Sequence, residues 1–412
     1  MALINGAPAS SSDNDIGKLV VLMITAFVDM VGLFMIVPLM PFYTLEFGGS
    51  ALVVGLLISS FSVAQLVSAP IWGRFSDRYG RRPALLIGLS AATIAYVVFA
   101  YSTSLWMLFA SRLVQGAGGG TVGVIQAYVA DATKPEHRAR SLGWLSAATN
   151  LGVAIGPVFG SMARGAGRSA PGLCAAALCI LNIIFAWRFL RESHDVAASA
   201  SVQTKNRSSA GAVARVITHS AEPASRLIWI YAIAMGAFTG VHAVLALFLN
   251  HRFAVDERSI GWFFMYIGTI SVVTRALFLG WLVDTLGEPR LSRIGQVLLA
   301  LGLLTLPFAY NYWQLAISVA LLPLGTAFTF PCVSAMLSRV IASHERGLYM
   351  GVQQTFGGLA RVIAPVSAGL AFDRLGVAVP FWASALLVVA TLFLGLGLEG
   401  YIKPKAQVAA VV

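Results

Sequence analysis

Apolar segments long enough to cross a lipid bilayer recur along the whole chain. They lie at about 18–43, 52–72, 84–102, 105–130, 140–162, 170–190, 227–250, 259–283, 291–310, 313–337, 346–371 and 378–400. Because an α-helix needs about 20 apolar residues to cross the hydrocarbon core, the pattern predicts an all-α polytopic membrane protein with twelve transmembrane helices. The composition agrees, since only 11% of the residues are charged against about a quarter in a soluble domain.

The basic residues fall mostly on one side of the predicted membrane. If the N-terminus is cytoplasmic, 20 of the 28 Lys and Arg residues lie on the cytoplasmic side, five lie on the other side and three lie within predicted helices. This asymmetry follows the positive-inside rule and places both termini in the cytoplasm. It also explains the net charge of +11, so we expect the lipid bilayer, and no nucleic acid, as a partner.

One long polar stretch divides the chain into two halves. The expected order is a disordered cytoplasmic tail (1–17), an N-terminal six-helix bundle (18–191), a cytoplasmic linker (192–226), a C-terminal six-helix bundle (227–401) and a second cytoplasmic tail (402–412). The linker is rich in Ser, Ala and basic residues, which is typical of a solvated connection. Residues 1–16 lack the regions of a signal peptide. The protein is expected to be a monomer.

The loop 73–83 holds the densest charge cluster of the first half. Its sequence is Gly-Arg-Phe-Ser-Asp-Arg-Tyr-Gly-Arg-Arg-Pro, between two apolar segments. Charges this dense cannot lie in hydrocarbon, so the loop is a tight, water-facing hairpin. A helix N-terminus stabilises a carboxylate, so Asp77 can dock at the start of the helix predicted over 346–371 and act as a conformational latch. Alternatively, the loop is a solvated turn that only fixes topology.

The two halves repeat one another at a nearly constant offset. Gly143 to Pro157 matches Gly351 to Pro365 at an offset of 208 residues. The loop pattern of Gly73, Asp77 and Gly80 returns 207 residues later as Gly280, Asp284 and Gly287. A duplicated unit of parallel topology is typical of transporters that rock two bundles about a central site.

The loop pattern Gly-x3-Asp-x2-Gly-Arg-Arg and its weaker copy resemble the major facilitator superfamily, over about residues 18–400. Other stretches are similar to its twelve-helix drug/proton antiporter branch, in particular the tetracycline-exporter-like group. These stretches are Val28–Gly32, Arg112–Gly116, Ala127–Asp131 and Gly152–Gly160. The resemblance implies two pseudo-symmetric six-helix bundles in a bacterial inner (cytoplasmic) membrane.

The resemblance also implies roles for single residues. Around the loop it implies a charge relay that includes Arg78, Arg81 and Asp131, with Asp284 in a weaker matching role. It implies an antiporter motif at Gly152, Gly156, Pro157 and Gly160, where plain small-residue packing is the alternative. Where tetracycline exporters carry a functional histidine, this chain has Ile270-Ser271-Val272, so tetracycline itself is not the expected substrate.

Asp29 is the only carboxylate deep within a predicted helix. An ionised Asp near the midplane costs at least about 2.5–3.5 kcal/mol unless it is paired or hydrated, so Asp29 is a candidate proton-coupling site. The alternative is a structural Asp bonded to Ser or Thr. Arg112 is its expected partner, because the resemblance places both on helices that line the central cavity. Alternatively, Arg112 clasps backbone carbonyls.

Two further arginines, Arg275 and Arg361, lie within predicted helices without an obvious acidic partner. They either clasp carbonyls, pair with a distant group such as Asp284, or bind an anionic group on the substrate. With Arg112 they leave three buried cations against Asp29 alone, which argues against a simple cationic drug.

Polar and aromatic residues within the predicted helices are candidates to line a substrate cavity. They are Gln65, Gln126, Asn150, Phe238, His242, Gln353, Gln354 and Arg361. For each of them, a structural or lipid-facing position is the alternative. His242 is also a possible second proton site. No metal site is predicted, because the three cysteines lie in apolar segments without ligand spacing.

The leading functional hypothesis is a proton-coupled antiporter that exports small amphipathic molecules, as in multidrug or antibiotic efflux. The proton gradient would supply the energy and no cofactor is expected. The alternative is a proton-coupled symporter or uniporter for an anionic metabolite or lipid-like compound. The glycine–proline motif favours export, and the cation excess favours the alternative. No catalytic motif is present, so an enzyme is not expected.

Overall fold

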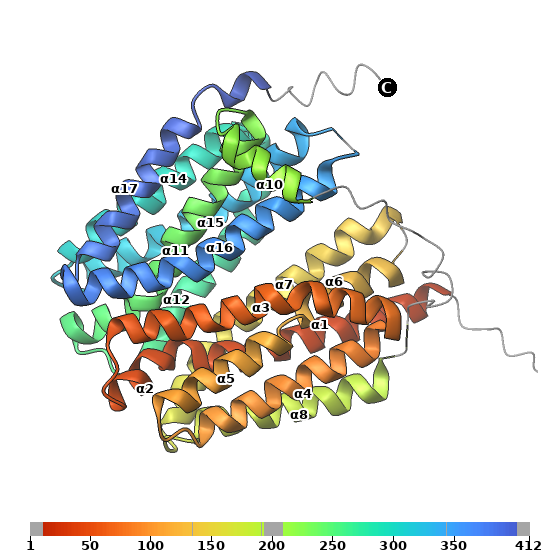
Figure 1. Ribbon diagram of the computed structural model, residues 1–412, viewed down its shortest axis with the longest axis vertical. Helices are drawn as coiled ribbons and strands as arrows, with labels where there is room; N and C mark the ends of the chain where they lie inside the picture. The colour runs from red at the N-terminus through yellow and green to blue at the C-terminus, as the bar shows by residue number, and fades with distance from the viewer. Residues whose placement is uncertain (1–10, 134, 191, 193–208, 343, 402–412) are drawn as a thin grey trace, which may run out of the picture.

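The computed structural model describes residues 11–133, 135–190, 192, 209–342 and 344–401, and within these ranges the chain is built from helices alone. Two bundles of long helices lie side by side (Figure 1). The predicted all-α membrane fold is therefore confirmed.

The first bundle runs from α1 to α8. Its elements are α1 (Ser11–Ile36), η1 (Val37–Leu39), α2 (Met40–Glu46), α3 (Ala51–Tyr79), α4 (Arg81–Ala100), α5 (Leu105–Gly118), α6 (Thr121–Ala132), α7 (Pro135–Arg164) and α8 (Ala170–Phe189). Helices α5 and α6 together form the predicted fourth span, which is interrupted at Gly119 and Gly120. Glycine weakens a helix because it loses more backbone entropy than other residues.

The second bundle runs from α11 to α17. Its elements are α11 (Pro223–Phe253), α12 (Ile260–Val273), η2 (Thr274–Phe278), α13 (Leu279–Leu286), α14 (Glu288–Thr305), η3 (Leu306–Phe308), α15 (Tyr312–Val340), α16 (Arg346–Arg374), α17 (Val379–Leu394) and η4 (Leu398–Tyr401). The element η2 is a single π-helical turn that contains Arg275.

All twelve predicted spans coincide with helices. Ten helices in the described ranges are long and apolar enough to cross a membrane. The other two spans are the interrupted pair α5–α6 and the shorter helix α17, with 16 residues.

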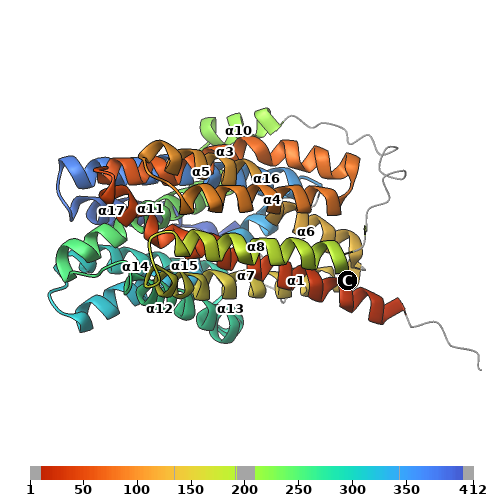
Figure 2. The same ribbon diagram turned by 90° about the horizontal axis from the view of Figure 1, so that it is seen from below.

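The segments expected to be tails and a linker are only partly described. Residues 1–10, 193–208 and 402–412 lie outside the described residues. Helix α1 begins at Ser11, within the segment expected to be a tail. The expected linker contains a ten-residue helix, α10 (Ser209–Thr218), which packs at the edge of α11 and α16 (Figure 2). Its Ala212 and Val216 side chains are buried there.

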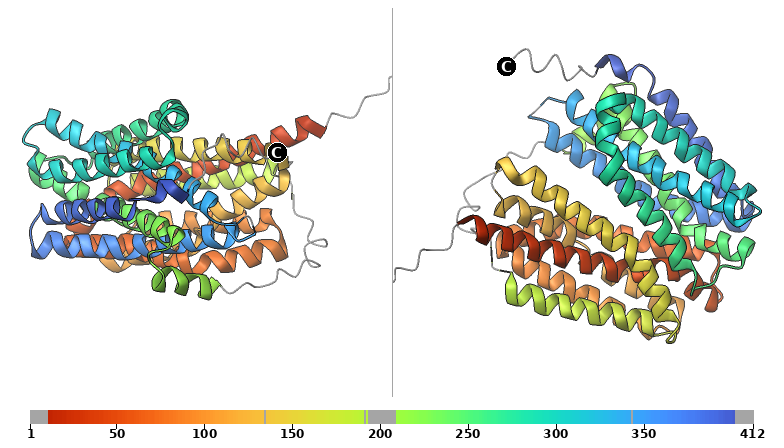
Figure 3. Two further views of the ribbon diagram at one scale, coloured as in Figure 1. Left: turned by 90° about the horizontal axis from the view of Figure 1, so that it is seen from above. Right: turned by 180° about the vertical axis from the view of Figure 1, so that it is seen from behind.

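The two bundles meet at one end and diverge toward the other (Figures 1 and 3). The end where the bundles meet is called the closed end, and it holds the turns at 47–50, 165–169, 254–259 and 375–378. The end where they diverge is called the open end, and it holds residues 73–83, 131–140 and 280–290. Contacts between the bundles run mainly through α3 against α16 and α7 against α12.

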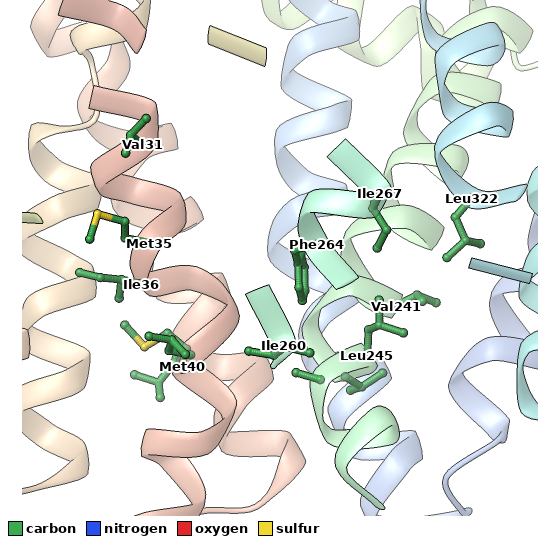
Figure 4. Close-up of a cluster of buried hydrophobic side chains, with 14 of the residues drawn as sticks. Val31, Met35, Ile36, Met40, Val241, Leu245, Ile260, Phe264, Ile267 and Leu322 are labelled. Carbon is green, nitrogen blue, oxygen red and sulfur yellow. The ribbon is translucent and has the colours of Figure 1, made fainter. Parts of the chain in front are cut away.

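One buried apolar cluster crosses from bundle to bundle. Figure 4 shows Val31, Met35, Ile36 and Met40 on one side and residues of α11 and α12 on the other. Ile260 of α12, which is fully buried, lies between the two sides. Apolar burial therefore joins the bundles as well as filling each of them.

Candidate functional site

Asp29 is buried inside the first bundle, and its carboxylate touches one edge of a cavity. Its side chain is only 8% exposed, and Oδ2 accepts a hydrogen bond of 3.1 Å from Thr121 Oγ1. Thr121 is the first residue of α6, so the interruption of the helix after α5 places a helix N-terminus beside the carboxylate. The positive end of a helix dipole stabilises an anion there. A hydrogen bond from a threonine is the structural alternative expected of Asp29, whereas the helix break at Gly119 and Gly120 was not predicted.

Arg112 is buried nearby but forms no direct ion pair with Asp29 in the described part of the chain. Its side chain is 2% exposed, and its Nε and Nη2 atoms have no acceptor among the described residues. Tyr96, itself fully buried, forms a side-chain hydrogen bond with Gln115. The direct pairing expected of Asp29 and Arg112 is therefore not found in this state.

Two adjoining cavities collect most of the predicted cavity residues. The first, about 690 Å³, is lined by α1, α6 and α7 and includes Asp29, Gln126 and Asn150. The second, about 810 Å³, lies between the bundles and includes Gln65, Gln126, Gln354 and Arg361. Because Gln126 lines both, the two cavities share a wall on α6.

Four candidate residues line neither cavity. The Gln353 side chain is fully buried and accepts a hydrogen bond of 3.3 Å from Ser334 Oγ. His242 Nδ1 lies 2.9 Å from the carbonyl oxygen of Phe238, and the rings of the two residues are tilted by 43° with centroids 3.9 Å apart. Arg275 is partly buried on η2, and its Nε atom has no hydrogen-bond partner among the described residues. The other three residues take part in packing within the second bundle, which is the structural alternative.

The closed end is sealed by polar contacts between the bundles. Asp373, near the end of α16, accepts hydrogen bonds from the backbone N–H groups of Ala51 (3.1 Å) and Leu52 (2.8 Å) at the start of α3. Arg164 forms ion pairs with Glu46 of the first bundle (2.5 Å) and Glu257 of the second (2.8 Å). A carboxylate capping a helix N-terminus across the interface is the arrangement that was expected of Asp77, but it is found at the opposite end.

Glycines make the same seal tight. A Cβ atom on Gly55 would overlap the carbonyl oxygen of Pro365, and one on Gly261 would overlap that of Pro157. Ser59 Oγ also donates a hydrogen bond of 2.6 Å to the carbonyl of Val362. Helices packed backbone to backbone in this way require small residues at the contact.

At the open end, the segment 73–83 is not the expected loop: it is the end of α3, the single turn residue Gly80 and the start of α4. Of the arginines expected in the charge relay, Arg81 forms ion pairs, whereas Arg78 lies over the Tyr79 ring. Arg81 bonds Asp77 (2.7 Å) and Asp131 (3.0 Å). Gly80 has a φ of +102°, which only glycine adopts readily. Sequence reasoning missed Glu192, which accepts hydrogen bonds of 3.0 Å from the backbone N–H groups of Arg81 and Arg82.

The second half keeps this relay with its charges exchanged. Glu288 follows Gly287 as Arg81 follows Gly80, and it pairs with Arg339 at 2.5 Å. Arg339 lies 208 residues after Asp131, at the end of the matching span. The pseudo-symmetric ion pair is therefore Arg–Asp in one half and Glu–Arg in the other, so a search for repeated residue types did not find it.

A family model decides the classification. The Major Facilitator Superfamily model matches residues 22–276 and, in a second match, residues 227–410. The chain belongs to the Major Facilitator Superfamily. The all-helical fold and the two bundles agree with this assignment, and the protein is a transporter rather than an enzyme.

Individual members of the superfamily are similar over most of their length. Tetracycline resistance protein, class C, of Escherichia coli is 30% identical over 84% of this chain and 88% of that protein. Multidrug resistance protein 2 of Bacillus subtilis is 26% identical over 95% of this chain and 97% of that protein. Among solved structures, the human organic anion transporter MFSD10 (TETRAN) superposes with a TM-score of 0.70 at 22% identity, covering 92% of this chain and 99% of that one.

In this superfamily member, the glycines of the expected helix-5 motif pack against α1. Cβ atoms on Gly152 and Gly156 would lie 2.6 Å from the carbonyl oxygen of Phe27 and 2.8 Å from that of Val31. A Cβ on Gly160 would overlap the carbonyl of Met35. Pro157 faces the other way, toward Gly261 of α12 in the second bundle. The motif thus fixes α7 to α1 while α7 contacts the opposite bundle.

Replacing Gly160 with alanine is expected to destabilise the protein, since backbone cannot yield as a flexible side chain would. Overpacking costs about 1–3 kcal/mol, so the melting temperature of the purified protein should fall by several degrees. Gly143→Ala is the matched control, because Gly143 lies on the same helix with nothing within 4 Å of an added Cβ. Equal melting temperatures for the two variants would contradict the packing role of Gly160.

Proposed function

We propose that this protein is a proton-coupled antiporter that exports small amphipathic molecules by alternating access. The observation that carries the proposal is the position of Asp29: its carboxylate is buried and bonded to a hydroxyl, and the residue lines a cavity that shares a wall on α6 with the space between the bundles. Intramembrane carboxylates mark proton relays in transporters. The tetracycline and multidrug resistance proteins to which the chain is similar support export.

The open end is assigned to the cytoplasm. The positive-inside rule supports this orientation, because the segment 73–83 and the loops of that end carry most of the basic residues. With this orientation the structure is the inward-facing state: the closed end faces outward and is sealed by Asp373 and Arg164.

The transport cycle follows from these positions. Substrate enters the space between the bundles from the cytoplasm. The bundles then rock, the closed-end contacts break, and Asp77 docks at the start of α16 to hold the open end shut. Protonation of Asp29 from the outside releases the substrate and favours return to the inward-facing state. Loss of the proton to the cytoplasm completes the exchange.

The buried arginines favour a second candidate, a symporter or uniporter for an anionic metabolite or lipid-like compound. Arg361 lines the space between the bundles, and Arg112 is buried near Asp29. The two candidates differ in how the proton moves relative to the substrate, so one transport measurement separates them.

The test uses purified protein in liposomes with an imposed pH gradient and fluorescent amphipathic dyes. Export by antiport predicts that dye accumulates in the compartment that is more acidic, with a matching outward flux of protons from it. Accumulation on the alkaline side would establish symport, and transport indifferent to the gradient would establish uniport. Either outcome would exclude the antiport proposal.

A further inference from the structure

The space between the bundles contains one cation that no protein group compensates. Its charged lining residues are Asp77, Arg81 and Arg361. Asp77 and Arg81 lie at the open end and pair with each other at 2.7 Å. Across the described ranges, Arg361 forms neither an ion pair nor a hydrogen bond with another residue. The cavity therefore carries a net positive charge, and that charge is located on Arg361.

Arg361 lies at the deep end of this cavity. The next residue, Val362, accepts the hydrogen bond of 2.6 Å from Ser59. One turn further, Pro365 packs directly on Gly55, where the seal begins. A molecule that enters from the open end therefore reaches Arg361 last, next to the contacts that must break when the bundles rock.

The surface around Arg361 is shaped to hold a ligand group. Gln354, Gly358 and Arg361 all line the cavity and are spaced at i, i+4 and i+7 on α16, so they share one face. A Cβ on Gly358 would lie 3.0 Å from Leu66 Cδ1 and 3.9 Å from Arg361 Nη2. Gly358 therefore lets Leu66 of the opposite bundle pack against α16 beside the guanidinium group, and the amide of Gln354 lies on the same face two turns from Arg361.

Part of the opposite wall is apolar. On α3, the apolar residues Leu66, Ala69, Pro70 and Trp72 line it beside the polar residues Ser62 and Gln65. The volume of about 810 Å³ lies within the range of drug-sized binding sites. A ligand that fills this space must combine an apolar body with a polar group at the Arg361 end.

We propose that Arg361, with Gln354, binds the oxyanion of an amphipathic organic anion, whose apolar body lies against the apolar residues of α3. A guanidinium group within the membrane without a counter-charge is costly in free energy. A planar carboxylate offers two oxygens that can accept two parallel hydrogen bonds from the guanidinium N–H groups. The substrate class is therefore anionic. The direction in which this anion is transported rests on the proposed export function, whereas its binding at Arg361 does not.

The test compares three ligands with the same apolar body: pyrenebutyrate, pyrenebutanol and pyrenebutylamine. Equilibrium binding to the purified full-length protein is measured by pyrene fluorescence without any pH gradient. The wild type should bind the carboxylate tightest. Arg361→Gln should weaken carboxylate binding about 10- to 100-fold, because a charge-assisted hydrogen bond is lost, and should leave the binding of the alcohol within about twofold.

Control variants separate binding from folding. Arg361→Lys should retain part of the carboxylate preference, since it keeps the charge but loses the bidentate fork. Arg252→Gln, an exposed arginine of the same bundle, should bind like the wild type. A wild type that prefers the amine or alcohol, or an Arg361→Gln variant that keeps the carboxylate preference, would overturn the assignment. Because no gradient is applied, a failure of proton coupling would leave these binding results unchanged.

Discussion

Asp29→Asn is expected to abolish proton-driven accumulation of substrate while leaving exchange of substrate across the membrane intact. The asparagine keeps the size of the side chain and the hydrogen bond to Thr121 but cannot take up or release a proton. Uphill transport in liposomes under an imposed pH gradient should fall at least about tenfold. Counterflow of labelled substrate, which needs no proton movement, should remain.

The control for this variant is a carboxylate outside the membrane. Glu222→Gln alters an exposed residue that pairs with Arg215 at 3.0 Å, and it should transport like the wild type. If Asp29→Asn still accumulates substrate in response to the gradient, Asp29 is not the coupling site. If counterflow is also lost in a folded variant, the carboxylate serves binding or structure instead.

Gly55→Leu should prevent the closed end from sealing and should stop transport. The added side chain would have to occupy the position of the Pro365 carbonyl on the opposite bundle, and the backbone of α16 cannot move aside without separating the bundles. A penalty of about 2 kcal/mol would shift the equilibrium between the two states about 30-fold toward the outward-facing state. The measurement is counterflow in liposomes.

Gly351→Leu is the matched control for Gly55→Leu. Gly351 lies on α16 with nothing within 4 Å of an added Cβ, so this variant should transport normally. Normal counterflow by Gly55→Leu would mean that α3 and α16 do not need to meet backbone to backbone during transport.

The fold and part of the site could be predicted from the sequence because they rest on local patterns. Apolar length specifies the spans, and the charges from Arg74 to Arg82 specify that the chain turns there at one end of the bundle. The depth of Asp29 in its helix follows from counting residues. None of these inferences requires knowing which helix lies beside which.

The contacts that could not be predicted each depend on a partner far away in the sequence. Thr121 bonds Asp29 across 92 residues, and Asp373 caps α3 across 321 residues. Gln353 and Gln354 are adjacent, yet one faces Ser334 and the other the cavity, because successive residues on a helix point about 100° apart. Spacing alone does not reveal which side of α16 faces the opposite bundle.

The central claim is that protonation at Asp29 switches the protein between states in which opposite ends are closed. Spin-label distances test this claim in the intact protein, with one pair at the open end and one at the closed end. Labels at Gly143 and Gly351 report the open end, where both positions have free space. Labels at Trp106 and Trp313, each 82% exposed, report the closed end.

Raising the pH in the presence of substrate should shorten the Gly143–Gly351 distance and lengthen the Trp106–Trp313 distance in the same fraction of molecules. In Asp29→Asn, neither distance should change with pH, because the asparagine cannot take up or release a proton. Distances that change together in the same direction, or an Asp29→Asn protein that still responds to pH as the wild type does, would contradict the account.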